Sequence, residues 1–395
     1  MMEILAPAGN PEKLRYAVYY GADAVYAAGK NFGLRAGSGN FSDEELKAAA
    51  EFCHKNKRKI YVTVNIFSHN RDESELSEYL KFLENIKVDA VIISDPGVLY
   101  LARKNCPGLD FHVSTQANIT SWMSAKYWQD QGASRVILAR ELGIEEIYGI
   151  SEKCPDLELE MFVHGAMCMS YSGRCLLSAH LNGRDANRGE CSHPCRWEYS
   201  IVEKKRPDQT FCAEQDSRGT YILNSKDLCL IKRLEEIKKA GVCSLKIEGR
   251  MKSLYYAANV TRVYRDAVHQ ANKPDIYLEE LDKVSHRVYC EGFFDGFDSS
   301  RTQYYESSAY IRNYQFLGEI IKSDDKCSIA AMRAKFSLGD EIEFIFPNLK
   351  DDFIWKADKI STDTDEDISF TKPNTIIKIP LDHSIPKYGI IRKKI

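Results

Sequence analysis

Four cysteines in one short stretch are the residues of this sequence most able to do chemistry. They lie between His164 and Trp197 with the spacing Cys-x6-Cys-x15-Cys-x3-Cys, and they are Cys168, Cys175, Cys191 and Cys195. Thiolates beside polar, glycine-rich backbone are typical ligands of iron–sulfur clusters or zinc, because soft sulfur ligands select these metals. We therefore predict a metal site in a loop over residues 164–197.

Disulfide bonds and structural zinc are the alternatives for these cysteines. The sequence opens at Met1 on a strand-like segment with no signal peptide, so we expect a cytoplasmic location, where disulfides rarely persist. Structural zinc usually uses two short Cys-x2-4-Cys pairs, and only Cys191 and Cys195 have that spacing. The pattern favours iron–sulfur over zinc, with Cys212 and Cys229 as reserve ligands.

A second set of polar residues follows the ends of predicted strands, where barrel enzymes place their chemistry. The candidate catalytic residues are Asn65, Gln116, His164 and Glu248. The candidate substrate-binding residues are Arg35, Asn118 and Arg250. A guanidinium suits an anionic carboxylate or phosphate, which it binds through two parallel hydrogen bonds. In the alternative interpretation the amides only satisfy backbone groups at the rim, and Glu248 and Arg250 form a structural ion pair.

Eight strand patterns alternate with longer helical patterns over residues 1–300. Strands are predicted at 3–8, 24–28 and 59–67, and around Val91, Val113, Val136, Phe162 and Ile247. Helices are predicted at 74–86, 97–105, 120–132, 143–153, 226–240 and 253–272, in addition to two earlier helices. Asn10 with Pro11 begins the first of these, and a capping box of Ser42 and Glu45 begins the second.

This alternation predicts an α/β fold, a TIM-like (β/α)8 barrel at residues 1–300. An open doubly wound sheet is the alternative, but no GxGxxG turn follows the first strand. Residues 306–395 instead show short strands punctuated by prolines and Asp/Asn clusters. They predict a small all-β barrel as a C-terminal domain.

Composition excludes few functions. The net charge of −3 over 395 residues shows no global basic surface, although a local patch could still bind nucleic acid. No run approaches the roughly 18 apolar residues of a membrane span, so we expect no membrane partner. Gly-x-Ser-x-Gly and HExxH are both absent, which leaves a hydrolytic mechanism without support from motifs.

Three segments of the sequence resemble peptidase family U32. They are EILAPAGNPEKLRYAVYYGADAVYAAG at the start, ELEMFVHGAMCMSYSGRCLLS at 158–178 and SLKIEGRMKS at 244–253. Within that family, GTYILNSKDLCLIKRL and the trailing β segments resemble the branch of prephenate-dependent tRNA hydroxylases, which form 5-hydroxyuridine.

The resemblance implies a 4Fe-4S cluster on Cys168, Cys175, Cys191 and Cys195, and hydroxylation of the wobble uridine of tRNA at carbon five. Prephenate would be the small anionic co-substrate and tRNA the partner, with Lys252 and Arg262 expected to hold RNA backbone. No oligomeric state is predicted. Two other functions stay open: a U32-type peptidase or collagenase, and an RNA-binding scaffold stabilised by a metal.

Overall fold

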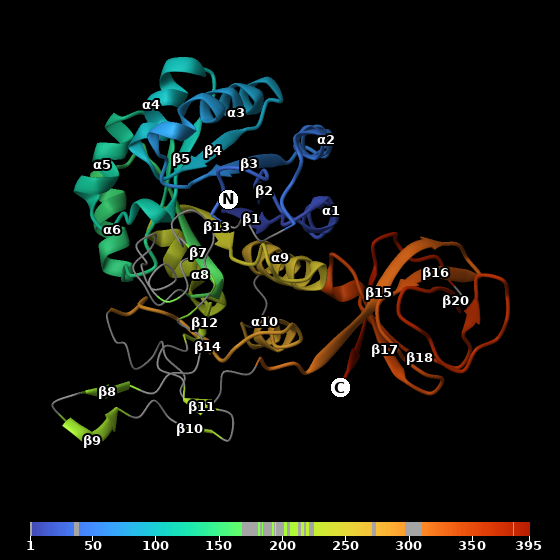
Figure 1. Ribbon diagram of the computed structural model, residues 1–395. Coiled ribbons are helices and arrows are strands. Elements are labelled where there is room, and N and C mark those ends of the chain that lie inside the picture. The colour runs from blue at the N-terminus through green and yellow to red at the C-terminus, as the bar shows by residue number, and fades with distance from the viewer. Residues whose placement is uncertain are drawn as a thin grey trace.

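Eight parallel strands form a closed barrel in the computed structural model of the protein (Figure 1). The structure describes residues 2–34, 39–167, 225–270, 274–296, 310–381 and 383–395, with isolated positions and short strands between 181 and 220. The barrel strands are β1 (Glu3–Pro7), β2 (Ala24–Ala27), β3 (Lys59–Val64), β4 (Ala90–Ile93), β5 (Phe111–Val113), β6 (Arg135–Ile137), β7 (Glu158–Ala166) and β13 (Val242–Ile247). Strand β13 pairs with both β7 and β1, which closes the sheet. The predicted fold class is confirmed.

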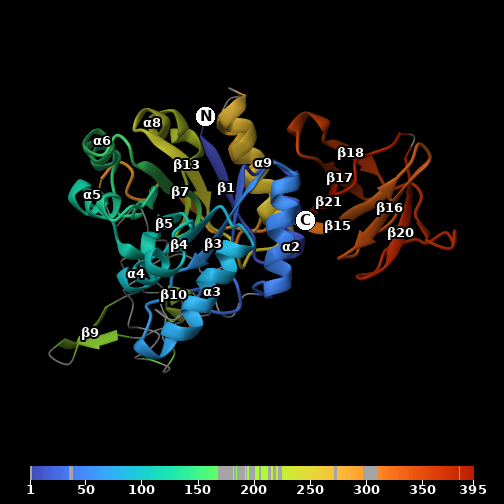
Figure 2. The same ribbon diagram turned by 90° about the horizontal axis from the view of Figure 1, so that it is seen from above.

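The helices lie outside the barrel, as Figure 2 shows from above. They are α1 (Pro11–Tyr19), α2 (Asp43–Lys55), α3 (Glu73–Asn85), α4 (Pro96–Asn105), α5 (Trp122–Asp130), α6 (Ile144–Lys153), α8 (Leu234–Lys239) and α9 (Leu254–His269). The predicted helix starts are confirmed: the Asn10 side chain accepts a hydrogen bond from the Lys13 amide, and Ser42 and Glu45 form the capping box. These caps satisfy backbone amides that a helix leaves unpaired in its first turn.

The helix predicted at 226–240 is wrong in its first half. Residues Asp227–Cys229 form strand β12, which runs antiparallel to the end of β7, and β14 (Tyr289–Cys290) pairs with β12 in parallel. A 3-10 turn, Ile231–Arg233, then leads into α8. This strand forms because of a tertiary contact. Strand β7 extends to Ala166, and its last residues pair with Asp227, Leu228 and Cys229. Such pairing overrides local helix propensity.

The C-terminal domain is an antiparallel sheet of seven strands around its own apolar core. The strands are β15 (Tyr314–Ser323), β16 (Cys327–Met332), β17 (Glu341–Ile345), β18 (Phe353–Lys356), β19 (Ser361–Thr362), β20 (Ile376–Pro380) and β21 (Ile390–Lys394). Figure 1 shows the sheet curling beside α9 and α10 (Pro274–Leu281). The domain boundary predicted near 300–306 stays a prediction, because residues 297–309 lie outside the described part of the chain.

Buried ion pairs join the two domains. Arg262 on α9 is fully buried and pairs with Glu280 on α10 and with Asp352, which follows β17, at 2.8 Å. Arg392 on β21 lies 2.5 Å from the same Glu280 carboxylate. The expectation that Arg262 binds RNA is therefore wrong, because this guanidinium holds the β domain against the barrel. Lys252 is half-buried, and its Nζ donates to the Ser285 carbonyl at 3.3 Å and lies 4.2 Å from the centre of the Tyr310 ring.

Among the residues that the structure describes, no helix is long and apolar enough to cross a membrane.

Candidate functional site at the carboxyl end of the barrel

The inside of the barrel changes from polar to apolar along its axis. At the amino-terminal end Arg135 donates to Glu3 at 2.6 Å and to Glu160 at 3.1 Å, and Lys246 donates to Glu160 at 2.8 Å. Burial alone would raise the pKa of Glu160, but Lys246 and Arg135 outweigh it, so this pKa lies below its ordinary value. This end of the barrel is closed by paired charges.

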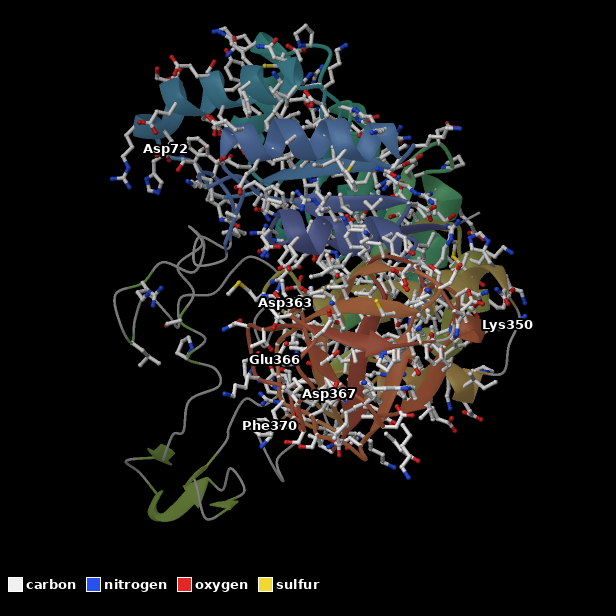
Figure 3. The ribbon with its side chains drawn as sticks, turned by 90° about the vertical axis from the view of Figure 1, so that its right-hand side faces the viewer. Asp72, Lys350, Asp363, Glu366, Asp367 and Phe370 are labelled. Atoms are coloured by element: carbon white, nitrogen blue, oxygen red, sulfur yellow. The ribbon has the colours of Figure 1, made fainter. Side chains whose placement is uncertain are left out.

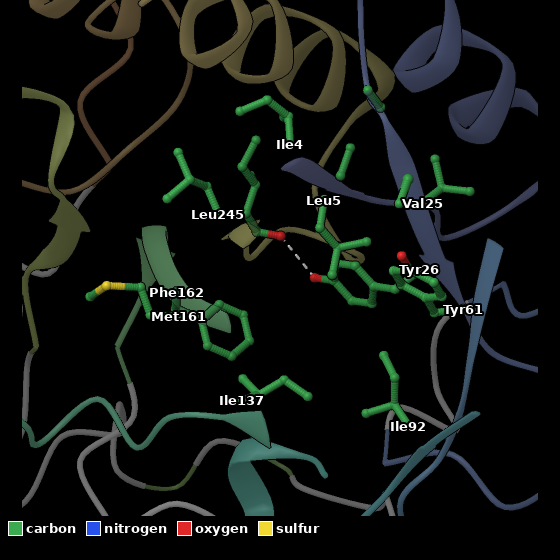
Figure 4. Close-up of a cluster of buried hydrophobic side chains, with 14 of the residues drawn as sticks. Ile4, Leu5, Val25, Tyr26, Tyr61, Ile92, Ile137, Met161, Phe162 and Leu245 are labelled. Atoms are coloured by element: carbon green, nitrogen blue, oxygen red, sulfur yellow. Dashed lines mark hydrogen bonds between the residues drawn. The ribbon is translucent and has the colours of Figure 1, made fainter. Parts of the chain in front are cut away.

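Apolar side chains fill the middle of the barrel, as Figure 4 shows for Leu5, Ile92, Ile137 and Phe162. Tyr26 lies among them and donates its hydroxyl proton to the Ile247 carbonyl, 2.9 Å away. Filled layers of side chains are normal for an eight-stranded barrel, whose interior is a core and not a pore. Chemistry must therefore take place beyond these layers, at the carboxyl ends of the strands.

Six of the predicted site residues lie at that carboxyl-terminal end. Their positions follow from parallel strands: each residue lies at or just after the end of β3, β5, β7 or β13, and they are Asn65, Gln116, Asn118, His164, Glu248 and Arg250. The seventh, Arg35, lies outside the described residues. The structure thus brings together the ends of four strands that are far apart in the sequence.

His164 is buried at the end of β7 inside a shell of tyrosines. The ring centres of Tyr256, Tyr264 and Tyr289 lie 6.0, 5.5 and 5.3 Å from that of His164. Burial, with smaller contributions from nearby His286 and Lys252, lowers the pKa of His164 to about 3, so the imidazole is neutral. Sequence reasoning missed these tyrosines, although the eight-residue spacing of Tyr256 and Tyr264 on α9 places both on one helix face.

The hydrogen bonds of His164 favour one tautomer. The Tyr264 hydroxyl lies 2.8 Å from the Val163 carbonyl and 3.4 Å from His164 Nδ1. If the hydroxyl donates to the carbonyl, Nδ1 must carry the hydrogen, which leaves Nε2 as an acceptor. Nε2 is buried and has no partner among the described residues. A neutral acceptor of this kind can orient a ligand or take a proton.

Asn65 and Arg250 both donate to or accept from the loop between β2 and α2, at Leu34 and at Asn40. Asn65 Oδ1 accepts from the amide of Leu34 at 3.2 Å, and Arg250 donates to Asn40 Oδ1 at 2.9 Å. Arg250 also donates to Thr63 Oγ1 at 3.1 Å, and its side chain is buried. These contacts give both residues a structural role in holding the loop that contains Arg35.

Gln116 and Asn118 lie in the turn after β5, η2 (Thr115–Ala117). Asn118 has a left-handed backbone with φ 55°, which asparagine tolerates better than most residues. Gln116 Oε1 and Asn118 Oδ1 are buried and have no hydrogen-bond partner within the described residues. Buried acceptors without a partner are rare and costly, so each of these oxygens calls for a hydrogen-bond donor from outside the described residues.

Glu248 follows β13 and lies against the end of β7. The Tyr26 hydroxyl is 3.3 Å from Glu248 Oε2. A Cβ on Gly165, whose φ is +107°, would come within 2.6 Å of the Glu248 carbonyl oxygen. Glycine at 165 therefore lets the strand that leads to the cysteine loop approach β13 closely.

The four predicted cysteine ligands lie outside the described residues, as does Cys212. The last residue described before them is Met167, directly after β7, so their loop begins at the carboxyl-terminal end of the barrel. The other reserve ligand, Cys229, is buried opposite His164, and burial raises its thiol pKa to about 12. A thiol must lose its proton to bind a metal, which disfavours Cys229. Across the described residues, no three His, Cys, Asp or Glu side chains are grouped to hold a metal.

A closed barrel with polar residues gathered at its carboxyl-terminal end defines a TIM-like protein with a candidate active site. Residues 9–304 match peptidase family U32, and residues 312–392 match the C-terminal domain of peptidase family U32. The chain therefore belongs to peptidase family U32, as the sequence motifs predict.

Several relatives are similar over much of the chain. Against tRNA hydroxylation protein P1 of Bacillus subtilis (strain 168) it is 38% identical over 406 residues, covering 99% of this chain and 94% of the relative. Against tRNA hydroxylation protein P of Escherichia coli (strain K12) it is 40% identical, covering 87% of this chain and 86% of the relative. An Escherichia coli 23S rRNA 5-hydroxycytidine synthase is 36% identical, with 67% of this chain matching 39% of that protein.

Proposed function

We propose that this protein is a tRNA hydroxylase that adds a hydroxyl group to carbon five of the wobble uridine. The observation that carries the proposal is the similarity to tRNA hydroxylation protein P1 through both domains, with 99% of the chain aligned. The similar 23S rRNA enzyme, whose name specifies 5-hydroxycytidine, also forms a 5-hydroxypyrimidine in RNA. That name supports carbon five of a pyrimidine as the proposed target, and a tRNA substrate agrees with the expected cytoplasmic location.

The finer part of the proposal is a 4Fe-4S cluster held by Cys168, Cys175, Cys191 and Cys195. A set of four cysteines is the usual ligand set of such clusters, and their loop leaves β7 beside His164. A bound cluster would supply redox chemistry at the carboxyl-terminal end of the barrel. Cys195 is the proposed fourth ligand in preference to Cys229, whose protonated thiol lies against Tyr264.

The protein's own residues would bind and orient the reactants. Arg35 is proposed to bind the carboxylates of prephenate, the anionic co-substrate, because guanidinium groups pair with carboxylates. The side-chain oxygens of Gln116 and Asn118, which have no partner among the described residues, can accept hydrogen bonds from the target base. His164 Nε2 and the Glu248 carboxylate are the groups proposed to accept or return a proton.

The direct test uses anaerobically purified full-length protein, tRNA and prephenate, followed by nucleoside mass spectrometry. We expect 5-hydroxyuridine only when all three are present. Omitting prephenate tests the co-substrate separately, because hydroxylation that persists without it would reject prephenate and retain the hydroxylase. A protein that leaves tRNA unchanged under all these conditions would contradict the proposal.

The cluster has its own test. Wild-type protein should absorb near roughly 400 nm and contain iron and sulfide in equal amounts. Cys195→Ala should lose the absorption and most of the iron, whereas Cys229→Ala should keep both. Colourless protein with one zinc would reject the cluster, and the reverse result for the two variants would make Cys229 the ligand. Peptide cleavage by the purified protein would support the peptidase alternative instead.

A further inference from the structure

We propose that an outward-facing patch of the C-terminal domain, formed by Lys335, Phe370 and Lys372, binds the RNA substrate outside the active site. We call these three residues the Lys–Phe–Lys patch. Its lysines would contact the phosphodiester backbone and the Phe370 ring would stack on an unpaired base. The inference rests on the proposed function, because it identifies where the RNA would be held.

The patch is built by two segments that pair in antiparallel fashion. Ser337 forms a bridge with Phe370, and the amide of Thr371 donates to the Phe336 carbonyl at 2.8 Å. This register places Lys335 directly opposite Lys372. Because Phe336 and Thr371 are buried, the alternating neighbours Lys335, Phe370 and Lys372 face outward.

The two lysines lie around one exposed aromatic ring. Lys335 Nζ is 4.4 Å from the centre of the Phe370 ring, and Lys372 Nζ is 6.0 Å from it. Phe370 is 39% exposed, so its ring can still meet a ligand. Exposed aromatic rings between cationic side chains are the combination that binds single-stranded nucleic acid, with bases on the rings and phosphates on the cations.

The charge of the patch is not balanced within the described residues. Like charges directly opposite each other on antiparallel strands destabilise the pairing. Nearby lysines have acidic partners: Lys378 pairs with Asp365 at 2.6 Å, and Lys359 with Asp367 at 3.4 Å. No ion pair to a described carboxylate is found for Lys335 or Lys372. A polyanion would relieve their mutual repulsion, and RNA supplies both the phosphates and the bases.

The patch lies on the same side of the molecule as the candidate active site. Asp72 ends the 3-10 turn after β3 (η1, Asn70–Asp72), at the carboxyl-terminal end of the barrel. Figure 3 shows Asp72 and Phe370 toward the same edge of the molecule, and Lys350 toward the opposite edge. One RNA molecule could therefore contact the patch while its target base enters the barrel site.

An acidic turn limits the direction of the RNA. Residues 363–367 include Asp363, Glu366 and Asp367, all exposed and only a few residues before Phe370. This turn would repel phosphates, so the backbone should leave the patch on the side of the lysines. Glu366→Gln removes one repulsive charge and should strengthen tRNA binding slightly.

The test measures tRNA binding to the full-length protein by fluorescence anisotropy at several salt concentrations. Lys335→Gln/Lys372→Gln should weaken binding severalfold and lower the slope of log Kd against log salt by about 1.4, since each phosphate contact to a single strand contributes roughly 0.7. Phe370→Ala should weaken binding at least about fivefold, as loss of base stacking does. Lys335→Gln alone should lower the slope by about 0.7. Lys350→Gln is its control, with the same charge change in the same domain on the opposite side.

The inference would be overturned if the patch variants, the Lys350→Gln protein and the wild type all bound tRNA equally. This would also be the result if the patch bound a protein partner instead of RNA. Wild-type protein that does not bind tRNA would also overturn it. Hydroxylation at saturating tRNA separates this result from failure of the proposed function. If wild type and patch variants all form 5-hydroxyuridine at saturation but bind tRNA equally, only the patch is rejected.

Discussion

The two ends of the barrel use buried polar groups in opposite ways. At the amino-terminal end, Glu160 accepts from both Arg135 and Lys246 and is fully buried. At the carboxyl-terminal end, His164 Nε2 and Gln116 Oε1 are buried without partners among the described residues. A paired group stabilises its own surroundings, whereas an unpaired one imposes a free-energy cost that a ligand can relieve. The buried carboxylate at the amino-terminal end is thus paired, whereas the two acceptors at the carboxyl-terminal end have no partner within the described residues and are open to a ligand.

One histidine at the amino-terminal end is an exception to this contrast. His112 on β5 lies near the amino-terminal charges, with its ring 4.6 Å from that of Tyr61. Its Nδ1 has no partner among the described residues. Burial, with a smaller contribution from the nearby Arg135, lowers the pKa of His112 to about 3, so this histidine is neutral beside paired charges.

The largest expected effect comes from breaking the amino-terminal network. Arg135→Leu leaves the Glu3 and Glu160 carboxylates without their shared guanidinium and should lower the free energy of unfolding by about 3–5 kcal/mol. Urea denaturation followed by circular dichroism measures the change. Arg103→Leu is the control, because Arg103 is exposed and, within the described residues, donates only to the Gln131 carbonyl. Equal losses in both variants would remove the distinction between the two ends.

At the carboxyl-terminal end, His164→Gln should affect activity far more than stability. If Nε2 acts on the reactants, tRNA hydroxylation should fall at least about a hundredfold, the usual range for loss of a general acid or base. The melting temperature should change little, because glutamine can keep a hydrogen bond to the Tyr264 hydroxyl and Nε2 makes none within the described residues. Nucleoside mass spectrometry and a thermal melt test this, with exposed His54→Gln as control. Unchanged activity would limit His164 to a structural role.

A pH series tests whether His112 stays neutral in the folded protein. In the folded protein its pKa is about 3, below the ordinary 6.5, so the unfolded state binds more protons as the pH falls. The stability due to neutral His112 is complete above about pH 6.5 and is lost toward pH 3, by about 1.4 kcal/mol per pH unit. His112→Phe should reduce this slope in urea denaturation between pH 6.5 and 4. An identical slope in wild type and variant would show that His112 is accessible to protons.

The smallest expected effect is that of Gln116→Leu. Because Gln116 Oε1 has no partner among the described residues, an apolar replacement of similar size should leave the free energy of unfolding within about 1 kcal/mol of wild type. The kcat/KM for tRNA should fall about tenfold if this oxygen binds the base, the equivalent of about 1.4 kcal/mol. Steady-state kinetics measures it. A loss of stability without a change in kcat/KM would place Gln116 with the structural residues.

The sequence predicts the barrel well because its strands are local patterns. β-branched runs mark the eight strands, and capping residues such as Asn10 and Ser42 mark helix starts within one turn. The helix predicted at 226–240 fails because β12 depends on the unusually long β7, a partner far away in sequence. As a basic side chain Arg262 is expected to hold RNA backbone, and only the packing of the two domains shows that it pairs with Glu280 and Asp352 instead.

The candidate site is predictable in position but not in role. Parallel strands place Asn65, His164 and Arg250 at one end of the barrel, as the sequence implies. Their hydrogen bonds are set by loops and helices elsewhere, so the support of the β2–α2 loop by Asn65 and Arg250 could not be predicted. The tyrosines around His164 come from α9 and β14, far from β7 in sequence.

The most direct test of the central claim is nucleoside mass spectrometry of tRNA from a bacterial host that lacks its own tRNA hydroxylation proteins. Expression of this chain should restore 5-hydroxyuridine or nucleosides derived from it. A Cys168→Ala/Cys175→Ala variant, expressed to the same level, should not restore them. Absence of these nucleosides with folded, cluster-loaded wild-type protein, or their equal restoration by the cysteine variant, would contradict a cluster-dependent tRNA hydroxylase.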